Sequence, residues 1–154
     1  MICDIYVECS LSWSEHGDAV VGIAMSAGDD EAKTVYGYMK DVTQAEAIIV
    51  GITRALGYTR LTEIRLHLSS PVIANAIQKG WLELWENSAY KNGTIKHAEK
   101  WHELFLKLKG RNVEIILNEF NGYRKHLRFE CAQRMKKHER IPSGIQSSGR
   151  YVRP

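Results

Sequence analysis

Cysteine and histidine often act as nucleophiles or metal ligands, and this chain offers few arrangements of them that could do so. Its three cysteines, Cys3, Cys9 and Cys131, include no C-x-x-C pair, which argues against a disulfide framework or a zinc ribbon. His97 and His102 are five residues apart, so one helix face would not present both rings. Cys131 could act as a nucleophile only beside an activating base, and the spacing places none. We expect reduced thiols in a cytoplasmic protein without a zinc site.

Two glutamates have distinctive positions in the predicted strands and helices. Glu8 lies in the middle of a predicted strand, where a charged side chain is unfavourable without a partner. Glu46 follows Thr43 by three residues at the start of a predicted helix. This is the spacing of a capping box, so capping of the helix is one role open to Glu46.

Positive charge is concentrated at the C-terminal end. Residues 121–154 contain nine Lys/Arg against two acidic residues, whereas the first 120 residues contain twelve Lys/Arg against sixteen, and the whole chain has a net charge of +3. A basic end on an otherwise acidic chain is typical of nucleic-acid binding. A solvated helix followed by a tail explains the same charges.

Hydrophobic periodicity predicts an α/β domain over residues 1–140 and a basic, flexible C-terminal tail over residues 141–154. Alternating apolar residues predict five strands, at 2–9, 19–27, 34–39, 62–68 and 113–117. Helical spacing predicts helices at 43–57, from 71 past 77, at 80–85, 95–108 and 124–137, with a polar loop at 86–93. This order implies a five-stranded mixed β-sheet, three antiparallel strands and then two more, flanked by α-helices.

The apolar runs are too short for a membrane span, which needs roughly 20 residues. Residues 19–25 and 45–49 are the longest such runs. We therefore expect no contact with a membrane.

The predicted order and several segments along it resemble the ribonuclease HI family. Gln44-Ala45-Glu46 matches a motif that opens the family's first helix, and Gly80-Trp81 to Trp85 matches the start of its basic protrusion. Lys96 to Trp101 is similar to the helix that carries a tryptophan in relatives, and residues 113–134 align without gaps on the last strand, loop and helix. The resemblance covers residues 2–137.

This resemblance implies an RNase H-like fold and a site for two divalent metal ions that hydrolyse the RNA strand of RNA–DNA hybrids. Four carboxylate positions carry over, and only Glu46 keeps its residue type. Glu8 stands in place of an aspartate, whereas Ser69 and Cys131 replace carboxylates. Arg124 falls near the position of the family's proton-shuttling histidine. We expect impaired or absent hydrolysis, with at most a weak site for Mg²⁺ or Mn²⁺ at Glu8 and Glu46.

The resemblance also indicates residues that would contact nucleic acid. They are the protrusion residues Lys91, Lys96, Lys100 and Trp81, with Lys125 and Arg128 of the last helix. Phosphate contacts from such cations are independent of base sequence and sensitive to salt. The tryptophans of this region are better explained as packing residues than as residues that stack on bases.

Three functions remain open from the sequence. The first is an RNase H-like protein that binds nucleic acid, an RNA–DNA hybrid or duplex, with little or no hydrolysis. The second is an active ribonuclease H that uses Mg²⁺ or Mn²⁺ in a rearranged site. The third is a protein-interaction module that uses the basic tail to bind a partner protein.

Overall fold

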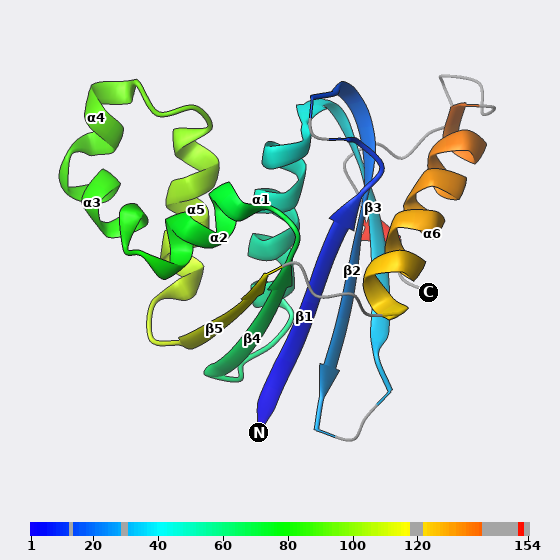
Figure 1. Cartoon of the computed structure of the whole chain (residues 1–154), viewed down its shortest axis with the longest axis horizontal. Coiled ribbons are helices and arrows are strands. Elements are labelled where there is room, and N and C mark those ends of the chain that lie inside the picture. The colour runs from blue at the N-terminus through cyan, green and yellow to red at the C-terminus, as the bar shows by residue number, and fades with distance from the viewer. Residues whose placement is uncertain (13, 29–30, 118–121, 140–150, 153–154) are drawn as a thin grey trace.

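A mixed β-sheet forms the centre of the computed structural model, which describes residues 1–12, 14–28, 31–117, 122–139 and 151–152 (Figure 1). The strand order is β5-β4-β1-β2-β3-β6. The strands are β1 (Ile2–Cys9), β2 (His16–Ala27), β3 (Lys33–Thr43), β4 (Glu63–Leu68), β5 (Asn112–Leu117) and β6 (Tyr151–Val152). β1, β2 and β3 pair antiparallel, whereas β4 pairs parallel with both β1 and β5. The predicted five-stranded mixed sheet is confirmed.

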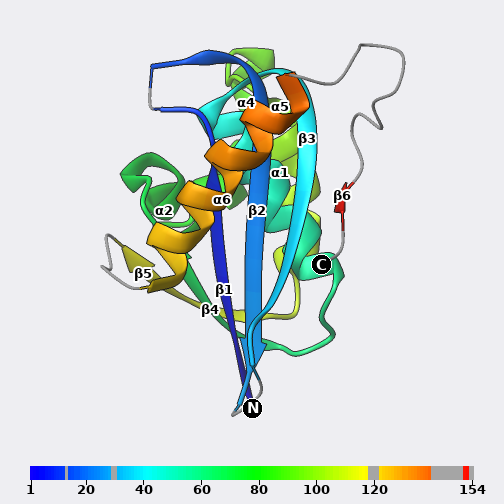
Figure 2. The ribbon, with the colours of Figure 1, turned by 90° about the vertical axis from the view of Figure 1, so that its right-hand side faces the viewer.

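Helices cover both faces of this sheet, which gives three layers (Figure 2). The helices are α1 (Gln44–Gly57), α2 (Pro71–Gln78), α3 (Trp81–Asn87), α4 (Ala89–Gly93), α5 (Ala98–Leu108) and α6 (Gly122–Glu139). α1 begins where the Thr43 hydroxyl accepts a hydrogen bond from the backbone N–H of Glu46, 3.1 Å away. None of the described helices is long and apolar enough to cross a membrane.

The two faces of the sheet bury two separate apolar clusters. Alternate residues of β1, Cys3, Ile5, Val7 and Cys9, enter the larger cluster with α1 and α5. The smaller cluster lies under α6 and contains Val20, Ala24, Tyr36, Tyr38, Leu127 and Cys131. Because strand side chains alternate, Asp4, Tyr6 and Glu8 of β1 face the α6 layer.

Three segments differ from the sequence-based expectation. Tyr151 and Val152, assigned to the flexible tail, pair antiparallel with β3, so a sixth strand extends the sheet; the other tail residues lie outside the described structure. β3 runs on to Thr43 instead of ending at 39. The expected loop at 86–93 instead contains the end of α3 and a turn in which residues 89–92 have φ between 49° and 56°. This left-handed turn costs about 1–2 kcal/mol per residue relative to a right-handed one, because each Cβ approaches the following carbonyl.

Candidate functional site

Glu8 forms a buried ionic cluster with the first turns of α6. Its Oε1 lies 3.4 Å from Nη1 of Arg128, and its Oε2 lies 3.5 Å from Nε of Arg124. The Ser69 hydroxyl donates a hydrogen bond to Oε1 over 3.4 Å. β1 supplies the carboxylate, the end of β4 supplies the hydroxyl, and two successive turns of α6 supply the guanidinium groups. The mid-strand glutamate therefore has the partners that its position requires.

The Glu8 carboxylate is far more buried than its partners. Its side chain is 4% exposed, against 30% for Arg124 and 39% for Arg128. Burial raises the pKa of the Glu8 carboxyl above its ordinary value, and the charges of Arg128 and Arg124 oppose that rise. The two guanidinium groups therefore offset a carboxylate that has lost most of its hydration.

Cys131 lies beneath Glu8 as a packed thiol. Its side chain is fully buried, and its sulfur is 3.8 Å from the backbone carbonyl oxygen of Glu8. Burial raises the pKa of Cys131 well above the ordinary thiol value. A protonated thiol is a poor ligand for magnesium and a poor nucleophile. This environment suits a core residue.

Glu46 has different partners from Glu8. Its Oε1 lies 4.0 Å from Nδ1 of His97, and the other ring nitrogen of His97 lies 3.3 Å from the Thr43 hydroxyl oxygen. His97 precedes α5, so this contact joins the starts of two helices. The Thr43 hydroxyl accepts a hydrogen bond from the backbone N–H of Glu46, which is the half of a capping box that Thr43 supplies, and the capping role of the Glu46 side chain stays a prediction.

The donor set around Glu8 does not fit a site for two divalent ions. Such a site needs several carboxylate oxygens to offset the charge of the metals. Within the described residues, no three or more His, Cys, Asp and Glu side chains come together to hold a metal. Glu8 instead faces two permanently charged guanidinium groups and a neutral hydroxyl. The cations beside this carboxylate are arginines.

Comparisons with known proteins agree with this architecture. No protein-family model matches the chain. It is 29% identical over 97 residues to ribonuclease H of Syntrophomonas wolfei, a match that spans 60% of this chain and 66%, just under two thirds, of that protein. The crystal structure of RNase H1 from Halobacterium salinarum superposes with a TM-score of 0.64 at 14% identity, over 90% of this chain and 99% of that one. The chain has the ribonuclease H-like fold.

Two further solved structures share the fold with this ribonuclease H-like chain. LC9-RNase H1 superposes with a TM-score of 0.69 at 18% identity, over 99% of this chain and 77% of that one. LC11-RNase H1, crystallised in complex with an RNA/DNA hybrid, gives a TM-score of 0.61 at 17% identity, over 87% of this chain and 99% of that one.

An aromatic stack joins the start of α6 to the sheet in this ribonuclease H-like structure. Tyr123 of α6 contacts Tyr6 of β1 with 4.9 Å between ring centroids, and Tyr6 stacks on His67 of β4 at 4.0 Å. His67 also forms a 2.8 Å hydrogen bond with Asp4. Because Arg124 follows Tyr123 directly, these contacts help to position the guanidinium cluster at Glu8.

The predicted protrusion residues lie on α3, α4 and the segment from α4 into α5. Lys91 and Lys96 are exposed, and Lys100 is half-buried. Trp81 is half-buried against the larger apolar cluster, with its ring 6.2 Å from that of Trp85. This contact favours packing as the role of Trp81. Their contact with nucleic acid stays a prediction.

The two predicted contact residues of α6 lie in different environments. Lys125 is exposed, whereas Arg128 contacts Glu8. The pairing of Glu8 with Arg124 and Arg128 was missed by the sequence analysis. A spacing of four places these two arginines on one face of α6, and Cys131 lies one turn further along the same face. Helical periodicity could therefore have shown that the two arginines act together, although not that Glu8 is their partner.

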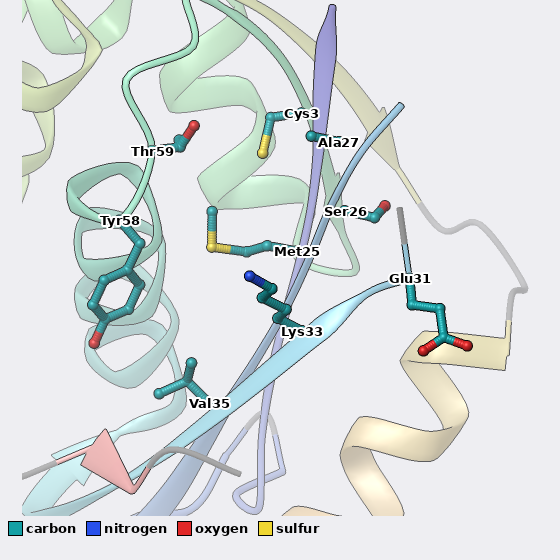
Figure 3. Close-up of a pocket in the computed structure, with 9 residues that line it drawn as sticks. All are labelled: Cys3, Met25, Ser26, Ala27, Glu31, Lys33, Val35, Tyr58 and Thr59. Carbon is teal, nitrogen blue, oxygen red and sulfur yellow. The ribbon is translucent and has the colours of Figure 1, made fainter. Parts of the chain in front are cut away.

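A cavity of about 340 Å³, shown in Figure 3, has Cys3 in its wall near the start of β1, whereas Glu8 lies near the end of that strand. Cys3, Met25, Lys33 and Tyr58 are among the side chains that line it. Cys3 and Glu8 point to opposite faces of the sheet and are separated by about 16 Å of strand. The cavity is therefore not part of the Glu8 site.

Proposed function

We propose that this ribonuclease H-like protein binds nucleic acid, an RNA–DNA hybrid or a duplex, and hydrolyses hybrids slowly or not at all. The observation that carries the proposal is the pairing of Glu8 with Arg124 and Arg128. A guanidinium group cannot polarise a water molecule into a nucleophile as a bound metal ion does. A carboxylate that is occupied by two arginines would have to release them before it could bind a cation.

The charge of α6 supports the binding part of the proposal. The helix contains six Lys/Arg residues against two glutamates, and it packs on the same face of the sheet as Glu8. Lys125, Lys136 and Lys137 of this helix are exposed. A phosphate backbone would find on this face a surface of the complementary charge.

Cleavage of a labelled RNA–DNA hybrid in Mg²⁺ and in Mn²⁺ tests the loss of hydrolysis. We expect no product above a metal-free control. Cleavage that requires metal and disappears in a Glu46→Gln variant would instead identify an active nuclease with a rearranged site. Glu46→Gln suits this purpose because it removes the carboxylate and leaves the backbone contact with Thr43 intact.

Gel-shift measurements with hybrid, duplex and single strands at two salt concentrations test the binding. We expect affinity for hybrid or duplex that falls as salt rises, because each phosphate contact releases counterions. A protein that binds none of these probes contradicts the proposal and favours a role in binding another protein.

A further inference from the structure

The Glu8 cluster carries a positive charge where the fold's metal-dependent relatives need a negative one. Glu8 contributes one negative charge and Arg124 and Arg128 contribute two positive charges, so the cluster has a net charge of +1. Protonation of Glu8 would only increase this value. A metal site must be negative before the ions bind, whereas a positive site attracts a phosphate directly.

The burial of the three side chains suits such a contact. The Glu8 side chain is almost inaccessible, whereas the side chains of Arg124 and Arg128 are each partly exposed, so both arginines contact Glu8 and also reach solvent. Arginine offers five N–H donors in a planar fork that matches the oxygens of a phosphate. Anchoring by Glu8 reduces the side-chain entropy that a free surface arginine would lose on binding.

We infer that Arg124 and Arg128, anchored by Glu8, bind a backbone phosphodiester of the nucleic acid directly, in place of the metal ions of the fold. The inference rests on the proposed function and makes it specific, because it names the ligand group and the residues. A direct contact has a consequence that a metal-bridged one lacks. Affinity should not depend on a divalent cation once ionic strength is held constant.

The inference can be tested by fluorescence anisotropy with the full chain and a labelled RNA–DNA hybrid. Titrations are run over a range of salt, in EDTA and in Mg²⁺ at matched ionic strength. Arg128→Gln and Arg124→Gln are compared with Arg60→Gln, which makes the same chemical change at an exposed residue between α1 and β4. That loop lies near the end of β4 that pairs with Ile2, away from Glu8.

We expect each arginine variant of the cluster to weaken binding about tenfold, the loss typical of one charge-assisted hydrogen bond. Each should also reduce the slope of log affinity against log salt by about one. Arg60→Gln should leave both quantities close to those of the unaltered protein. Circular dichroism at the assay temperature verifies that every variant is folded.

Glu8→Gln separates phosphate binding from a purely structural role. Glutamine keeps an oxygen that can accept a hydrogen bond from the guanidinium groups, while the cluster loses its negative charge, so binding should tighten a few fold at low salt. A site that only stabilises the fold gives no gain in affinity from this change. Arg128→Lys keeps the charge without the planar fork, and we expect it to bind between the unaltered protein and Arg128→Gln.

The outcomes distinguish failure of the phosphate-binding inference from failure of the proposed function on which it rests. If the unaltered protein binds the hybrid but the Arg124 and Arg128 variants bind as Arg60→Gln does, the inference is overturned and the proposed function stands. Binding that requires Mg²⁺ also overturns the inference. If the unaltered protein binds no probe, the proposed function fails, and the inference fails with it.

Discussion

Nη1 of Arg128 lies 3.4 Å from Oε1 of Glu8 although 120 residues separate the two along the chain, and only the glutamate is buried. The contact joins the face of β1 that carries Glu8 to α6, the helix that covers this face of the sheet. Loss of this contact costs more free energy for the glutamate than for the arginine, because solvent can rehydrate the arginine but not the buried carboxylate.

This inequality predicts opposite outcomes for two single substitutions. Arg128→Gln leaves a buried carboxylate with less compensation, so we expect it to lower the free energy of unfolding by about 1–3 kcal/mol. Glu8→Gln leaves two arginines that remain partly exposed, so its cost should stay below about 1 kcal/mol. Urea denaturation of both variants measures the difference. Equal losses would show that burial of the carboxylate does not dominate the pair.

The raised pKa of Glu8 predicts a pH dependence of stability. Above the ordinary value of 4.5 and up to the raised pKa, the folded state binds more protons than the unfolded state, so unfolding free energy falls as pH rises through this window. Glu8→Gln lacks this titration. The stability of the unaltered protein relative to Glu8→Gln should therefore decrease from about pH 4.5 upward, measured by denaturation over a pH series. A relative increase would contradict the direction of the shift.

Gly51 allows α1 to approach the sheet, and alanine at this position should be destabilising. A Cβ there would lie 2.6 Å from Cγ1 of Val7 and 2.9 Å from Cγ1 of Val21. We expect Gly51→Ala to cost about 1–3 kcal/mol through overpacking, which exceeds the gain in helix propensity. Gly57 of the same helix is the matched control, because the nearest atom to its Cβ would be Nζ of Lys107 at 3.8 Å. Gly57→Ala should be neutral or stabilising by up to about 1 kcal/mol in urea denaturation.

The three cysteines should react slowly in the folded protein. All are buried, and burial raises the pKa of Cys9 to about 11. At pH 8 the thiolate fraction of Cys9 is then about one in a thousand, against about one in ten for the ordinary value of 9.0. Alkylation by iodoacetamide, followed by mass spectrometry, should proceed slowly, accelerate as pH rises and become fast in urea. Rapid labelling of Cys131 in the folded state would indicate an accessible, activated thiol.

The sequence determined the layers of the fold and the residue types at the candidate site. Alternation along β1 and helical spacing along α1 and α5 are local patterns, and each follows from which side chains must leave water. The same patterns predicted strands β1 to β5. β6 was not predicted, because two residues in a polar segment become a strand only when an edge strand offers free hydrogen-bonding groups.

The tertiary structure decided what surrounds Glu8. The sequence placed one glutamate on a strand and several cations on a helix, but it did not say which cations would reach the carboxylate. Packing of α6 over β1 and β2, with Cys131 and Leu127 against Gly22, brings Arg124 and Arg128 to Glu8. Burial of the carboxylate disfavours its charged form, and the cations that the fold places beside it are two arginines.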